Sequence, residues 1–137
     1  MTRLRVRAAL AATLALSAVP AFSHHSFTVA FDEQRPVSIE GVVTEVKWEN
    51  PHSWIFVEAK RPDGGVEQWR FETQPPNTLR RTGVTAAILK PGVTVTIKGY
   101  GSQDRSSMAA AASVIVFPNG ESFRISAGGT PPPKDGQ

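Results

Sequence analysis

The sequence predicts a small all-β domain with one short helix, folded as an OB-fold-like barrel that is partly open and has five or six strands. Most segments after residue 36 alternate apolar and polar side chains, and turns containing glycine or proline separate them. Only the stretch between the third and the fourth of these segments changes to a helical pattern. The first segment is long enough to be a bent first strand, which favours the barrel over a β-sandwich, the alternative architecture.

The first predicted strand covers residues 37–48. Its alternation changes phase at Gly41, which indicates a β-bulge or a sharp bend. Asn50 and Pro51 end the strand, because asparagine favours turns and proline cannot donate a hydrogen bond to a neighbouring strand. Residues 54–59 are the second predicted strand.

A hairpin and a helical segment follow. Residues 61–65, Arg-Pro-Asp-Gly-Gly, predict a hairpin turn, and the third strand covers residues 66–72. Asn77 is the predicted N-cap of a short helix, and Gly83 is its predicted end. Residues 85–90 are expected to add a further helical turn.

The fourth strand is expected at residues 93–98, and a final hairpin at residues 108–125 follows a polar loop. The predicted parts of the chain are a signal peptide that is removed (1–23), an N-terminal arm (24–36), the OB-like barrel domain (37–127) and a disordered C-terminal tail (128–137).

Residues 1–23 have the features of a cleavable export signal. Three arginines precede an apolar run that is shorter than the about 20 residues of a membrane-spanning helix, and small residues stand before His24. We expect cleavage after Ser23, or alternatively after Ala21, and a periplasmic or secreted product. The chain has no cysteine, which excludes disulfide bonds, a thiolate metal site and a lipid anchor on the mature chain.

The charge balance argues against nucleic acid and membrane partners. The chain has 15 Lys and Arg residues against 12 Asp and Glu residues, but three of the arginines and none of the acids lie in residues 1–23. The mature chain is therefore balanced in formal charge, and it lacks the basic excess that attracts phosphate backbones or anionic lipids.

Several motifs resemble those of a known family. They are His24–Phe27, Phe31–Asp32, Gly41–Val43, Trp48–Trp54, Leu79–Gly83 and Leu89–Gly92. On these residues the chain resembles a group of small exported bacterial proteins, domain of unknown function 6152. The resemblance implies an exported, barrel-like domain, and it implies no activity.

All three histidines fall within two of these motifs: His24 and His25 at the expected mature start, and His52 in the Trp48–Trp54 segment. A mature N-terminal His24 would offer its α-amine and one imidazole nitrogen to Cu(II) or another divalent ion, with His52 or His25 as a further ligand. Copper is the preferred ion because it favours nitrogen ligands.

The metal hypothesis requires that the arm run back along the first strand. The arm from His24 to Pro36 extends at most about 40 Å, and a strand over residues 37–48 rises roughly 36 Å. The alternative is that the histidines are structural: a solvated chain start, and a turn residue at His52.

Aromatic residues give a second hypothesis. Trp48 and Trp54 flank the loop between strands one and two, where OB-folds bind ligands, and Asn50 lies within that loop. Exposed tryptophans would stack on a ligand, whereas buried ones would be core. Trp69, which shares a strand face with Phe71, is expected in the core.

No catalytic constellation is discernible, so the sequence predicts a binding protein and not an enzyme, with copper-dependent oxidation as the least favoured alternative. Asp32 or Glu49 would support the metal ligands through hydrogen bonds. Arg80 and Arg81 are expected to form a salt bridge with Glu72 or Asp32. The partner is a small ligand or a periplasmic protein.

Overall fold

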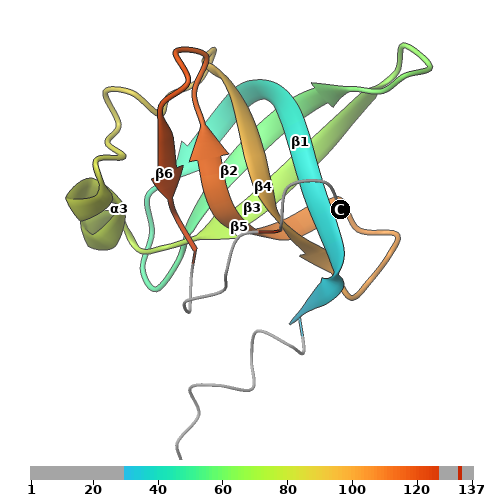
Figure 1. Ribbon diagram of the computed structural model, residues 1–137, viewed down its shortest axis with the longest axis horizontal. Coiled ribbons are helices and arrows are strands. Elements are labelled where there is room, and N and C mark those ends of the chain that lie inside the picture. Colours follow the sequence, from blue (N-terminus) through green and yellow to red (C-terminus); the bar gives the residue numbers. More distant parts are fainter. Residues whose placement is uncertain (1–29, 127–132, 134–137) are drawn as a thin grey trace, which may run out of the picture.

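The computed structural model describes residues 30–126 and residue 133. Between residues 31 and 124, six strands and the helix α3 follow each other (Figure 1). Their bounds are β1 Phe31–Lys47, β2 Ser53–Lys60, β3 Val66–Thr73, α3 Pro76–Thr82, β4 Thr94–Ser102, β5 Ala109–Val116 and β6 Ser122–Arg124. Among the described residues, no helix is both long and apolar enough to cross a membrane.

The strands form a ring, which confirms the predicted barrel. Neighbouring strands pair in the order β3-β2-β1-β4-β5-β6, and a further parallel pairing joins β3 to β5. This last pairing is short, from Arg70↔Ala109 to Glu72↔Ala111, so the barrel is only partly closed along that seam. The ring of β1 to β5, with a helix between β3 and β4, is the arrangement of an OB-fold. Strand β6 lies outside the ring and pairs with the end of β5.

Strand β1 begins at Phe31, six residues earlier than expected, so the final part of the predicted arm belongs to the sheet. Phe31 pairs with Ser102 at the end of β4, and the Arg35 guanidinium donates a hydrogen bond to the Ser102 carbonyl at 2.9 Å. The sequence Asp-Glu-Gln-Arg-Pro lacks apolar alternation, its residues are not buried, and the pairing with β4 shifts register between Phe31 and Pro36. The strand start is therefore visible only in the pairing with β4.

Gly41 lies where β1 changes partners. The strand pairs with β4 up to Val42 and with β2 from Val42 onward, and it arches over the barrel in Figure 1. A Cβ atom at Gly41 would lie 2.4 Å from the Glu58 carbonyl oxygen, so only glycine fits this crossing. The predicted phase change is found two residues later, as a register shift between Val43 and Glu45.

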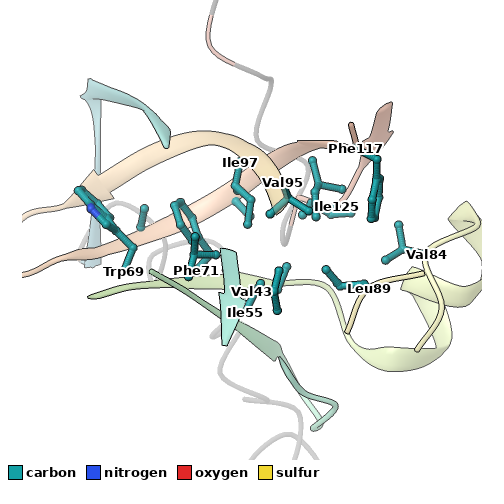
Figure 2. Packing of buried hydrophobic residues seen from close by; sticks show 14 of the residues in the cluster. Val43, Ile55, Trp69, Phe71, Val84, Leu89, Val95, Ile97, Phe117 and Ile125 are labelled. Carbon is teal, nitrogen blue, oxygen red and sulfur yellow. The ribbon is translucent and has the colours of Figure 1, made fainter. Parts of the chain in front are cut away.

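The core fills the barrel and extends to α3. Inward side chains from β1 to β5 alternate with outward ones, as in the buried series Ser53, Ile55, Val57 and Ala59 of β2. Figure 2 shows the core as a continuous layer between Trp69 at one end and Val84 at the other. Trp69 is 6% exposed and stacks on Phe71, which confirms its prediction as a core residue.

Helix α3 closes one end of this core through Leu79, which is completely buried. Its N-cap is Pro75 and not Asn77, because the helix starts two residues earlier than predicted, with a proline at its first position. Gly83 ends the helix in the left-handed conformation at φ 101°, as predicted.

The expected salt bridges of the helix are absent from the described part of the chain. The Arg80 guanidinium donates to the Asn77 side chain and that of Arg81 to Thr78, both one turn earlier on the same helix. The two expected acidic partners face other residues, since Glu72 contacts His52 and Asp32 lies 3.9 Å from Arg105.

Candidate functional site

The outer surface of β1, β2 and β3 carries an aromatic strip. Because Ile55 and Val57 point into the barrel, the alternation of β2 turns Trp54 and Phe56 outward, where both remain half-buried. The register places Lys47 of β1 opposite Trp54, and Arg70 of β3 opposite Phe56. We call this surface the aromatic face; its members are His52, Trp54, Phe56, Glu58, Gln68, Arg70, Glu72, Lys47 and Glu45.

Both aromatic rings of the face contact a cation from a neighbouring strand. The Lys47 ammonium lies 5.1 Å from the centre of the Phe56 ring. The Arg70 guanidinium carbon lies 5.9 Å from the centre of the Trp54 ring. Such contacts stabilise an exposed site by only about 0.5–1 kcal/mol each, so they hold the side chains in place without preventing their displacement by a ligand.

At one end of the strip, His52 is held by Glu72. The His52 Nδ1 atom lies 2.5 Å from Glu72 Oε1, and Glu72 is itself opposite Trp54 in the β2–β3 register. With Nδ1–H donating to the carboxylate, the neutral ring carries its acceptor lone pair on Nε2. The His52 side chain is 41% exposed, so its ring remains accessible from solvent.

At the other end of the strip, the Gln68 side-chain amide donates to Glu58 at 2.8 Å. The face thus presents three successive rows along β2 and β3: Glu58 with Gln68, Phe56 with Arg70, and Trp54 with Glu72. Polar pairs at both ends and aromatic rings between them can receive an extended ligand that has both apolar and hydroxyl groups.

The loop between β4 and β5 reaches this surface from the other side. Its last residue, Met108, accepts a hydrogen bond from the backbone nitrogen of Arg70 at 3.0 Å. The loop between β1 and β2, which contains His52, meets β3 two residues further along, at Glu72. Both loops that flank the ligand surface of OB-folds therefore contact the strand that carries Arg70 and Glu72.

The comparison with protein families returns one match. The model of the family of unknown function DUF6152 matches residues 11–111, more than half of the chain. The chain belongs to this family. No curated protein and no solved structure matches it. The earlier resemblance is thereby confirmed, and membership in DUF6152 carries no assigned activity.

In this DUF6152 chain, the two tryptophans that flank the loop between β1 and β2 differ in their surroundings. Trp48 is half-buried and packs against the hydrophobic core, whereas Trp54 lies on the outer surface of β2. Asn50 and Glu49 are exposed in the loop between them. The two tryptophans thus have different surroundings.

Only one of the three predicted metal ligands of this chain lies within the described residues. His52 is described, and His24 and His25 lie outside the described residues. Within residues 30–126, no group of three or more His, Cys, Asp or Glu side chains is arranged to hold a metal ion. Asp32 lies at the start of β1, whereas His52 follows its end.

Seven members of the aromatic face were missed at the level of sequence, and four of them are Lys47, Phe56, Arg70 and Glu72. Phe56 carried a usable signal, because it stands two residues after Trp54 in a strand with period-two alternation. The other three come from neighbouring strands, and their positions depend on register, which local alternation does not specify.

A separate groove of about 490 Å³ opens where β1 leaves β2. Ser38–Glu40, Ala59–Asp63 and Glu67 line it. The Arg61 guanidinium in its wall is paired with Asp63 at 3.1 Å. It contains neither a histidine nor a residue of the aromatic strip, so it is not part of the candidate site.

Proposed function

We propose that this protein is an exported, non-enzymatic binding protein that holds a ligand on the aromatic face of its barrel. The observation that carries the proposal is the outward strip of Trp54 and Phe56, bordered by hydrogen-bonding side chains at both ends. Tryptophan supplies a large apolar surface together with a polar N–H group. It therefore suits a face that is exposed to water when free and covered when a ligand binds. Support for export comes from the sequence of residues 1–23.

Support also comes from the position of the face. Ligands of OB-folds bind across the outer side of strands two and three, between the loops that follow strands one and four. Here the strip occupies β2, and Arg70 and Glu72 project from β3. Fold alone does not establish function, so the proposal depends on the side chains at that position.

The proposal is tested by NMR on the mature protein. Three chemically different probes are titrated: chitohexaose, a short oligothymidine, and a proline-rich peptide. We expect at least one to shift the indole N–H signal of Trp54 and the amide signals of β2 and β3, and to leave buried Trp69 unaffected. Trp54→Ala should weaken that binding at least tenfold, whereas Arg124→Ala, an exposed change on β6, should not. If no probe perturbs the face at millimolar concentration, the proposal is wrong.

A second candidate function is copper binding, favoured by the contact between His52 and Glu72. Histidines that ligate metals commonly donate their other ring N–H to a carboxylate, which orients the ring and raises its basicity. The 2.5 Å contact at Nδ1 has this form, and Nε2 would be the ligand atom. In this proposal His24 contributes its α-amine and imidazole, and His25 is a further ligand.

The copper proposal has a strict geometric requirement. From His24 to Phe31, where β1 begins, seven chain steps reach at most about 25 Å. A straight strand of the length of β1 would span about 53 Å, so the arching of β1 has to bring its two ends much closer together for one chain to supply both histidines.

Native mass spectrometry of the protein processed by its own signal, with and without one equivalent of Cu(II), tests the copper proposal. We expect a chain that starts at His24 and retains copper, and an affinity at least tenfold lower in His52→Ala. If that affinity is unchanged, His52 is not a ligand, and copper retention reports only a chelate at the chain start.

A further inference from the structure

The charges on the aromatic face constrain the class of ligand. Its two cations, Lys47 and Arg70, are accompanied by three carboxylates, those of Glu45, Glu58 and Glu72. Lys47 also lies 4.0 Å from Glu45. A phosphate backbone needs an excess of cations along its path, because its affinity depends on neutralised phosphates. The three carboxylates instead oppose a polyanion.

The aromatic rings are spaced as successive platforms. Trp54 and Phe56 are both outward residues of β2 and stand two positions apart, which separates them by about 7 Å along the strand. This spacing lets each ring face one unit of an extended chain of six-membered sugar rings. The C–H groups on one side of a sugar ring carry slight positive charge and pack on the negative face of an aromatic ring.

The cations over the two rings can take a second role. Their contacts are weak at an exposed site, so a sugar ring that packs on Trp54 or Phe56 can replace them. The displaced Arg70 guanidinium and Lys47 ammonium are then free to donate hydrogen bonds to sugar hydroxyls, which accept as well as donate.

The polar pairs at the ends of the strip suit neighbouring hydroxyl groups. Each pair places an acceptor beside a donor: Glu72 beside His52 at 2.5 Å, and Glu58 beside Gln68 at 2.8 Å. Two adjacent hydroxyls of a sugar can donate to the Glu58 carboxylate and accept from the second N–H of Gln68. At the other pair they can donate to the Glu72 carboxylate and to His52 Nε2. Carboxylates serve neutral hydroxyl ligands well and anionic ligands badly.

From these observations we infer that the ligand of the aromatic face is a neutral oligosaccharide. The inference rests on the proposed function and adds the ligand class. The rings of Trp54 and Phe56 supply the packing surface, and the pairs His52–Glu72 and Glu58–Gln68 select hydroxyl groups. The absence of cationic excess on the face predicts that binding does not depend on ionic strength.

Titration at about 50 mM and about 200 mM salt tests the inference, because binding that neutralises phosphates falls steeply over this range. The probes are fully N-acetylated chitohexaose and cellohexaose, which are neutral, a short oligothymidine and the proline-rich peptide. We expect at least one neutral hexaose to shift the Trp54 indole signal with dissociation constants that agree within twofold at the two salt concentrations. Trp54→Ala should weaken the binding of that hexaose at least tenfold. Trp54→Phe should retain part of the affinity, and Arg124→Ala should leave the affinity unchanged.

The outcomes separate the inference from the proposed function. If the oligothymidine or the proline-rich peptide perturbs the face and neither hexaose does, the ligand class is wrong and the binding function stands. If a hexaose binds but Trp54→Ala leaves its affinity unchanged, the sugar site is not on this face and the inference fails. If no probe perturbs β2 and β3, both fail. Retained far-UV circular dichroism in the Trp54 variants shows that they are folded.

Discussion

Ser53 at the start of β2 and Thr73 at the end of β3 form a directly opposed pair, and both are fully buried. Thr73 donates its hydroxyl hydrogen to the Ile125 carbonyl, whereas the Ser53 hydroxyl has no hydrogen-bond partner among the described residues. A buried hydroxyl without a hydrogen-bond partner destabilises the folded state, whereas one with a partner stabilises it. The same chemical group thus has opposite effects at two neighbouring positions.

This contrast gives a prediction about stability. Ser53→Ala should leave the free energy of unfolding unchanged or raise it by up to about 1 kcal/mol, because it removes an unsatisfied polar group. Thr73→Val should lower it by about 1–2 kcal/mol, because the change keeps the shape and removes the hydrogen bond. Urea unfolding of the two variants measures both values. A larger loss for Ser53→Ala than for Thr73→Val would contradict the assignment.

Asp104, in the loop between β4 and β5, has a lowered pKa relative to its ordinary value of 3.8. The first cause is the hydrogen bond that the Ser106 hydroxyl donates to Asp104 Oδ1 at 2.7 Å, followed by the bond from the Ser106 backbone nitrogen at 2.9 Å. A lowered pKa means that the ionised carboxylate favours the folded loop. That contribution is present above the ordinary pKa and is lost as the pH falls through the lowered one.

We therefore expect Ser106→Ala to raise the pKa of Asp104 toward its ordinary value while the backbone bond persists. Titration of the Asp104 carboxyl carbon signal by NMR measures this shift. Ser107→Ala is the matched control. The Ser107 backbone nitrogen donates to the backbone carbonyl of Asp104 and not to its carboxylate. An equal shift in both variants would exclude the Ser106 hydroxyl as the cause.

At the scale of elements, the path of β1 depends on one glycine. Gly41 lies where the strand passes from β4 to β2, and an added Cβ would lie 2.6 Å from Val57 Cγ1 as well as against the Glu58 carbonyl. Both neighbours belong to β2, so relief of the clash would require the two strands to separate.

Gly41→Ala should therefore lower the free energy of unfolding by roughly 1–3 kcal/mol, the range for overpacking. Gly65→Ala provides the control, because a Cβ there meets only the flexible end of the Arg61 side chain. Its effect should stay within about 0.5 kcal/mol, as for most surface changes. Thermal or urea unfolding distinguishes the two, and equal losses would contradict a special role for Gly41.

At the scale of the molecule, strands distant in sequence close the barrel around one core. Strand β1 pairs with β4, and β3 pairs with β5, so many contacts join segments far apart along the chain. Helix α3 adds Leu79 to the same buried cluster. A single core shared in this way predicts cooperative unfolding, and its non-local pairings predict slower folding than in a helical bundle of the same size.

Leu79→Ala tests this cooperativity. The change should cost about 2–5 kcal/mol, the range for a buried leucine truncated to alanine. It should shift the urea midpoint seen by far-UV circular dichroism, which reports the strands, together with the midpoint seen by tryptophan fluorescence. A shift in only one of the two signals would show that α3 unfolds separately from the barrel.

Part of the candidate site was readable from local pattern. The Asn50–Pro51 break located the loop between β1 and β2, and the same motif contained His52 and Trp54 of the aromatic face. The faces of Trp48 and Trp54 were not readable, because the intervening turn interrupts the alternation that relates them. The partners of His52 and Trp54, Glu72 and Arg70, come from β3, twenty and sixteen residues further along the chain.

The sequence by itself determined the order of strands, the place of the short helix and the barrel that they form, because alternation, glycine and proline act within a few residues. The tertiary structure decided where β1 starts, which tryptophan faces outward and which charges surround it. Those features depend on register between strands distant in sequence, and a shift of one residue in that register would turn every side chain of a strand to the opposite face.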